Sequence, residues 1–260
     1  MVPPDKGVGM PSSRVSGSAR WALLAAGLSF AGPALAQDTG DGFLFRRPTG
    51  TLTIRGGYDR AGAGSDVFSF VTERLTLGRG DFSSLTLAAD LSAQLSDRFD
   101  IVFGMTYSGT SARSEYRHWV DQDYLPIEQT TSFARMPFTV GLRAYLTGRG
   151  RSIGSLAWVP ARYAPYVSAG AGAMWYKFRQ DGDFVDFETL DVFADDFNSS
   201  GWTVTAFGSA GVEVALSPRL CLVGEGRYTW ARANMRESFV GFERIDLSGL
   251  SATAGIAFRM

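Results

Sequence analysis

The chain has a single histidine, His118, and this is the first residue to consider for catalysis. It follows Ser114 by four positions, and Glu115 stands between them. A serine activated by a histidine that a carboxylate orients is an arrangement used for nucleophilic catalysis. Beyond these residue types the segment contains no catalytic pattern. We therefore interpret His118 as a surface histidine and expect no enzymatic activity.

A second candidate for chemistry is the acidic segment 180–200. Its carboxylates and aromatic rings are Asp181, Asp183, Asp186, Glu188, Asp191, Asp195, Asp196, Phe184, Phe187, Phe193 and Phe197. Carboxylates at this density can bind Ca²⁺ or Mg²⁺, but the spacing differs from that of a calcium-binding loop. We expect a solvated loop rather than a cation site. The sequence has no phosphate-binding loop or zinc spacing, so we predict no metal site and no cofactor.

A third group consists of charged residues inside segments that alternate between apolar and polar positions. These residues are Arg55, Asp90, Arg143, Glu213, Glu225 and Arg227. In an extended chain, alternate side chains point to opposite faces. All six fall on the polar faces of their segments, so whichever surface those faces form must accommodate three positive and three negative charges.

The alternation itself predicts eight strands. They cover 50–58, 84–95, 100–108, 135–146, 164–179, 201–216, 220–231 and 249–260, and the clearest alternation is that of 84–95. Long polar connections are expected at 59–82, 111–132, 180–200 and 232–247, the first with a short helix. Ser96–Arg98 and Ser217–Arg219 read as tight turns. Segment 147–164 stands where a short turn is expected, and we predict a small helix or an extra hairpin there.

Composition and the N-terminus bear on location. The 260 residues are 45% hydrophobic, and the net charge of −1 argues against general nucleic-acid binding. Arg14 and Arg20, an apolar run and an Ala-Leu-Ala site before Gln37 predict a cleavable signal peptide over 1–36. A flexible leader over 37–49 follows. No later apolar run is long enough for a transmembrane helix, so membrane residence requires a closed barrel.

The chain resembles the small eight-stranded outer-membrane barrels typified by the membrane domain of outer membrane protein A. The resemblance covers 50–260 and rests on the strand pattern, the Ala-Gly-rich run at 164–172 and the last strand. That strand ends in Gly255-x-x-Phe258-x-Met260, which is similar to the sorting signal of such barrels. The resemblance implies an all-β, antiparallel, up-and-down transmembrane barrel in the cell outer membrane. It also implies a monomer that meets outer-membrane lipids and lipopolysaccharide and is inserted by the barrel-assembly machinery.

In such a barrel the apolar faces meet lipid and the six charged residues point inward. An unpaired buried ion costs several kcal/mol, so we predict ion pairs that plug the lumen. The expected contacts join Asp90 to a neighbouring arginine, and Glu213 or Glu225 to Arg143 or Arg227. Two interfacial aromatic girdles are also expected: Tyr58, Tyr107, Trp175, Trp202, Tyr228 and Trp230 near the long connections, and Phe99, Tyr163 and Phe258 near the tight turns.

The function predicted from these features is non-enzymatic. It is a structural role in the envelope or a surface interaction through the long connections. Two alternatives remain open. One is a narrow channel for small or hydrophobic solutes, which requires a lateral gap or a lumen free of ion pairs. The other is an outer-membrane enzyme that modifies lipid A and would use His118.

Overall fold

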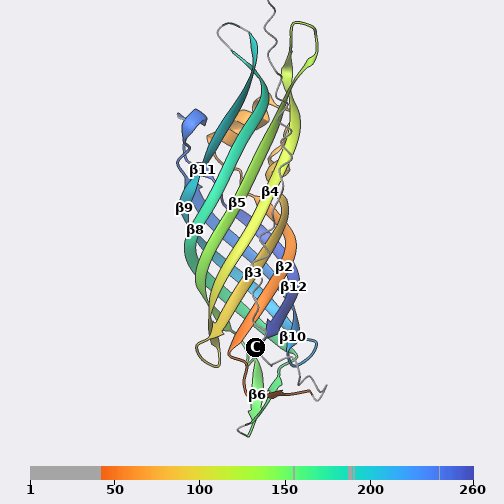
Figure 1. Cartoon of the computed structure of the whole chain (residues 1–260), viewed down its shortest axis with the longest axis vertical. Helices are drawn as coiled ribbons and strands as arrows, with labels where there is room; N and C mark the ends of the chain where they lie inside the picture. Colours follow the sequence, from red (N-terminus) through yellow and green to blue (C-terminus); the bar gives the residue numbers. More distant parts are fainter. Residues whose placement is uncertain (1–41, 155, 187–188, 190, 240) are drawn as a thin grey trace, which may run out of the picture. The chain divides into compact units, whose positions relative to one another are not determined.

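The computed structural model describes residues 42–154, 156–186, 189, 191–239 and 241–260. The predicted signal peptide lies outside this range. Within it, no helix is long and apolar enough to cross a membrane. Antiparallel strands dominate the fold (Figure 1).

Eight long strands form a closed ring. In chain order they are β2 (Gly50–Ala61), β3 (Ser84–Gln94), β4 (Phe99–Val120), β5 (Pro126–Tyr145), β8 (Tyr163–Val185), β9 (Val192–Ala215), β10 (Leu220–Ala233) and β12 (Gly249–Arg259). Each strand pairs with the next, and the last, β12, pairs with the first, β2. The predicted eight-stranded, up-and-down antiparallel barrel is therefore confirmed.

The tight turns expected at 96–98 and 217–219 lie at one end of the barrel. Both use the same hydrogen bonds: the amides of Leu95 and Ser96 donate to the carbonyl of Phe99, and those of Leu216 and Ser217 donate to the carbonyl of Leu220. The Ser217 hydroxyl also accepts from the Leu220 amide. The shared Leu-Ser-x-Arg sequence thus encodes one turn geometry at two places.

Segment 147–164 forms the extra hairpin, which is one of the two structures expected there. Its strands are β6 (Gly150–Ile153) and β7 (Ala157–Pro160), and it extends from the tight-turn end of the barrel (Figure 1). A two-residue strand, β1 (Leu44–Phe45), pairs with β7. Part of the segment expected as a flexible leader is therefore hydrogen-bonded to this hairpin.

Two of the expected long connections are mostly strand. The β4–β5 connection spans only 121–125, and β8 and β9 remain paired as far as Val185 and Val192. The polar connections predicted over 111–132 and 180–200 were therefore wrong as loops. Away from lipid both faces of a strand can carry polar residues, so the alternation ends there while the backbone pairing continues. In Figure 1 these two hairpins rise beyond their neighbours.

The other two long connections are folded against the end of the barrel opposite the tight turns, which we call the upper end. The first contains α1 (Asp66–Arg74), which confirms the expected helix, and a 3₁₀ turn, η2 (Arg79–Phe82). The last contains the 3₁₀ turn η3 (Glu237–Phe239) and the two-residue strand β11 (Ile245–Asp246), which pairs with β10.

The outer surface of the ring carries a band of exposed apolar side chains. Val204 is 82% exposed, Leu85 80% and Leu87 67%, and others in the band include Leu52, Ile54, Leu91, Phe103, Val140, Leu142, Leu222, Leu250 and Ile256. A water-soluble protein rarely exposes so large an apolar surface. A closed sheet satisfies its backbone groups in hydrocarbon, and short turns face the periplasm in outer-membrane barrels. The chain is therefore an outer-membrane barrel. Following the arrangement general to such barrels, we call its tight-turn end periplasmic and its long-hairpin end extracellular.

Candidate functional site

The structure places all six predicted charged residues inside the barrel, in one connected group. Arg55 lies at the centre, with Nη2 2.7 Å from Asp90 Oδ2 and Nη1 3.0 Å from Glu225 Oε2. These three side chains are about 1% exposed. The strands of Arg55 and Asp90, β2 and β3, are direct neighbours. Glu225 lies on β10, which is joined to β2 through β12, so the Arg55–Glu225 contact forms only when the barrel is closed.

Arg143 and Arg227 extend the group across the lumen. Arg143 lies 3.5 Å from both Asp90 and Glu213, and its guanidinium stacks on the ring of Tyr166 at 4.2 Å. Arg227 Nε lies 3.0 Å from Glu225 Oε1. The contacts expected for Asp90, Glu213 and Glu225 are thus present, and every predicted charge has an opposite charge within 4 Å.

A second layer of the network, nearer the periplasm, was not predicted. Arg149 Nη1 lies 2.9 Å from Asp100 Oδ2, and Arg259 Nη2 lies 3.1 Å from Glu213 Oε2. The Tyr145 hydroxyl donates to Glu213 at 2.7 Å. Asp100 and Arg259 follow the alternation of their strands and were open to prediction on that ground. Arg149 precedes the β6–β7 hairpin, and no periodic pattern marks it.

The periplasmic mouth is occupied by side chains from this hairpin. Trp158, on β7, is 2% exposed, and the Arg259 guanidinium lies 5.5 Å from the centre of its ring. Arg149 also donates to the Thr51 hydroxyl at 3.2 Å. We call the group of Arg55, Asp90, Asp100, Arg143, Arg149, Glu213, Glu225, Arg227 and Arg259 the lumen network.

Toward the cell exterior the lumen changes from charged to apolar. One buried pair marks the boundary: Arg135 Nη2 lies 3.0 Å from Asp59 Oδ2, and Arg135 Nη1 donates to two backbone carbonyls. Beyond it, Phe68 of α1 packs edge-to-face against Phe82, Phe133 and Phe178, with ring centres 4.7 to 5.7 Å apart. The helix α1, the turn η2 and the strands β5 and β8 thus build an apolar core inside the extracellular half of the barrel.

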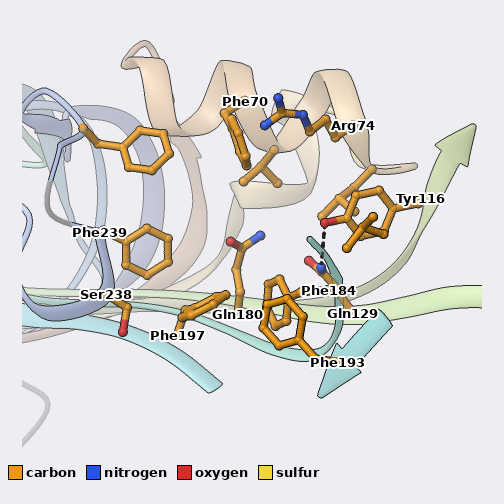
Figure 2. A pocket seen from close by; sticks show the side chains of 14 residues that line it. Phe70, Arg74, Tyr116, Gln129, Gln180, Phe184, Phe193, Phe197, Ser238 and Phe239 are labelled. Atoms are coloured by element: carbon orange, nitrogen blue, oxygen red, sulfur yellow. Dashed lines mark hydrogen bonds between the residues drawn. The ribbon is translucent and has the colours of Figure 1, made fainter. Parts of the chain in front are cut away.

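Above this core lies a pocket of about 240 Å³, shown in Figure 2. It is lined by α1, the two long hairpins and η3, and half of its lining residues are aromatic: Phe70, Tyr116, Phe184, Phe193, Phe197, Phe239 and Phe242. Phe184 and Phe197 are in edge contact at 4.4 Å. Phe184, Phe193 and Phe197 of the acidic segment 180–200 therefore line the pocket, whereas Asp195 and Asp196 are exposed. Phe187 and Glu188 of that segment lie outside the described residues.

The few polar groups of the pocket are held in place. The Gln129 amide donates to the Tyr116 hydroxyl at 3.3 Å and to the Asp183 carbonyl at 2.8 Å. The Arg74 guanidinium stacks on the ring of Phe70 at 3.8 Å. Figure 2 shows phenylalanine rings on both sides of the buried Gln180 side chain. The pocket thus combines an apolar wall with a small number of oriented amides.

The structure does not bring the candidate catalytic residues together. Ser114 and His118 both lie in β4, and four residues of extended strand separate their backbones by about 13 Å. Ser114 is buried and donates to the Gln129 carbonyl, whereas His118 is exposed. Among the described residues, no group of His, Cys, Asp or Glu has the arrangement of a metal site.

The terminal strand is placed at the closing seam. Gly255 of β12 faces Arg55 of β2, and a Cβ on Gly255 would lie 2.0 Å from the Ile54 carbonyl oxygen. Phe258 is half-buried, and Met260 is 53% exposed at the periplasmic rim. The glycine of the expected sorting motif therefore has a steric role, because it lets the first and last strands approach.

Comparison with known proteins gives likenesses of fold alone. No protein-family model and no curated protein sequence matches the chain. Among solved structures, it is similar to neisserial surface protein A, with 12% identity and a TM-score of 0.43 over 84% of this chain and 97% of the other. For OprG of Pseudomonas aeruginosa the values are 14%, 0.42, 84% and 99%. For Ail, the attachment invasion locus protein of Yersinia pestis, they are 12%, 0.40, 81% and 99%.

Proposed function

We propose that this outer-membrane barrel is a non-conducting anchor that holds a folded, ligand-binding structure at the cell surface. The observation that carries the proposal is the lumen network, in which buried arginines and carboxylates from strands all around the barrel pair across its middle. Eight strands leave an interior that side chains just fill. A channel would need to break these pairs, and each break leaves an unpaired buried charge.

Further support comes from the two ends of the lumen. Trp158 and Arg149 occupy the periplasmic mouth, and the Phe68 cluster fills the upper barrel. A solute moving along the barrel axis would therefore have to pass both a charged layer and an apolar layer of packed side chains. The separation of Ser114 from His118 along one strand supports a non-enzymatic role.

Planar-bilayer recording on the refolded full-length chain tests the proposal. We expect no steady unit conductance at voltages where a general porin, recorded in the same bilayer, conducts. Heat-modifiable gel mobility before the recording verifies that the inserted protein is a folded barrel. Reproducible unit steps from the folded fraction would overturn the non-conducting anchor and favour the narrow channel.

We propose a second part of this function, the binding of a small apolar molecule in the extracellular pocket. The supporting observation is the aromatic cavity of about 240 Å³ above the Phe68 cluster. An engineered apolar cavity of about 150 Å³ accepts benzene, and pockets for drug-sized ligands begin near 300 Å³. A ligand with one aromatic ring and a short substituent therefore matches the space. The apolar core below the pocket supports a binding site rather than a channel entrance.

Fluorobenzene binding, followed by ¹⁹F NMR in nanodiscs, tests the pocket. Ser238→Trp places a ring at the pocket wall, and Ser152→Trp places the same ring on the exposed β6 hairpin. Relative to empty nanodiscs, we expect a bound resonance for the wild type and for Ser152→Trp, but not for Ser238→Trp. A resonance that both variants retain, or none with the wild type, would refute the pocket as a ligand site.

A further inference from the structure

Basic side chains follow exposed aromatic residues on the outside of the barrel, at the end where the first aromatic girdle was predicted. On β2, Arg60 follows exposed Tyr58 by two positions, and on β10, Arg232 follows exposed Trp230 by two positions. Side chains two positions apart share a face, and the second lies about 7 Å further along the strand. Interfacial aromatic rings mark the headgroup level of a membrane. These arginines therefore sit where the headgroups of the outer leaflet lie.

The densest of these basic regions is a cleft of about 280 Å³ between β9 and the segment 232–244. It contains the exposed side chains of Arg232, Arg236 and Arg244. We call it the rim cleft. Arg244 Nε donates to the Asn234 side-chain oxygen at 3.0 Å. Among the described side chains, no carboxylate forms an ion pair with any of the three arginines.

The lower wall of the rim cleft is apolar and meets lipid. Trp202 and Val204 of β9 line it, with exposed fractions of 59% and 82%. The Thr203 hydroxyl donates to the Arg232 carbonyl at 2.7 Å, which fixes the arginine beside this apolar wall. Three cations above a lipid-facing wall form an amphipathic site with its charged part on the extracellular side.

We propose that the rim cleft binds a phosphorylated glycolipid of the outer leaflet, of the lipid A type. The guanidinium groups would hold its phosphates by charge-assisted hydrogen bonds, for which arginine is well suited. One acyl chain would lie along Trp202 and Val204. An acidic extracellular polymer lacks an acyl chain and would leave that wall unused, so the paired charge and apolar surface favour a lipid. The proposal rests on the proposed membrane anchor and assigns it a lipid partner.

Rim cleft variants in nanodiscs test this assignment. The test variant is Arg232→Gln, Arg236→Gln and Arg244→Gln, and the matched control is Arg98→Gln, Arg151→Gln and Arg162→Gln, which removes three exposed arginines at the periplasmic end. Diphosphoryl lipid A is titrated into phosphatidylcholine nanodiscs that hold the full-length barrel, and bound lipid is counted by native mass spectrometry. Because each basic residue near an anionic surface contributes modestly, we expect about 10- to 100-fold weaker binding for the test variant and none of this loss for the control.

Two further arms make the outcome decisive. Dephosphorylated lipid A should bind the wild type as weakly as diphosphoryl lipid A binds the test variant. Equal lipid A binding by the test and control variants would overturn the proposal, as would capture of soluble heparin with no lipid A bound. Heat-modifiable mobility is recorded for every variant. A barrel that fails to insert refutes the membrane anchor, whereas an inserted barrel without lipid selectivity refutes only the rim cleft.

Discussion

At the scale of single residues, the lumen network shows what sequence can and cannot reveal. The alternation of side chains along each strand predicted that Arg55, Asp90 and Glu225 point into the barrel, and the structure shows them in contact there. The alternation predicts whether a side chain points inward or outward, but not its level along the barrel axis. It therefore could not show that Glu213 contacts both Arg143 and Arg259. Arg149 escaped detection because it belongs to no lipid-spanning strand.

Replacing Glu213 with glutamine should destabilise the folded barrel. The change leaves two buried arginines without their shared carboxylate, and loss of one partner of a buried pair costs about 3–5 kcal/mol. The control is Asp196→Asn, which breaks the exposed pair with Arg179 and should cost under about 1 kcal/mol. Equilibrium unfolding in urea, in lipid vesicles, measures both. Equal losses would contradict a buried network.

The exposed ion pair between Arg179 and Asp196 in the β8–β9 hairpin should depend on pH. The Arg179 guanidinium donates two hydrogen bonds to Asp196, at 2.7 and 2.8 Å, and holds the pKa of that carboxyl below its ordinary value of 3.8. A depressed folded-state pKa contributes stability above the unfolded-state pKa, and that stability is lost as the pH falls through the folded-state pKa. The hairpin pair should therefore persist at neutral pH and weaken in acid below about pH 4. Arg179→Gln should raise the Asp196 pKa, as read by carboxyl ¹³C NMR; an unchanged midpoint would exclude the pairing in solution.

At the scale of elements, the lipid-spanning portions of the strands were predictable and their extracellular continuations were not. Alternation located β3 to within one residue, because lipid on one side and a charged lumen on the other force the pattern. In the upper parts of β4 and β9 water replaces lipid, and the pattern no longer marks the strand. The aromatic pocket was hidden for a related reason: it joins Phe70, Phe184 and Phe239 from three connections that are distant in sequence.

The stability of helix α1 should depend on the buried ring of Phe68. Phe68 is fully buried in the upper core, whereas Phe70 on the same helix is 38% exposed. Phe68→Ala should cost about 3–5 kcal/mol in that core. We expect faster amide exchange across Asp66–Arg74 in Phe68→Ala, with the lipid-spanning strands still protected, and a smaller change in Phe70→Ala. Uniform loosening of all strands would indicate that the helix and barrel unfold as one unit.

At the scale of the whole molecule, the inside and the outside of the barrel can be distinguished by tryptophan quenching. Trp202 and Trp230 are more than half exposed on the apolar band, and Trp158 is buried at the periplasmic mouth. In variants that retain one of these three as the sole tryptophan, lipids with brominated acyl chains should quench the fluorescence of Trp202 and Trp230. The fluorescence of Trp158 should stay unchanged. Strong quenching of Trp158 would reverse the assignment of the faces and with it the barrel's place in the membrane.

The distance in sequence between the partners of the lumen network has a consequence for biogenesis. Arg55 and Glu225 are 170 residues apart, and Arg259 reaches Glu213 from the final strand. A nascent sheet that has not received β12 therefore lacks the Arg259–Glu213 pair and the closure that brings Arg55 to Glu225. Such an open intermediate is poorly suited to hydrocarbon. We therefore expect membrane entry to be coupled to completion of the ring, and chains that lack β12 to be disfavoured in the bilayer.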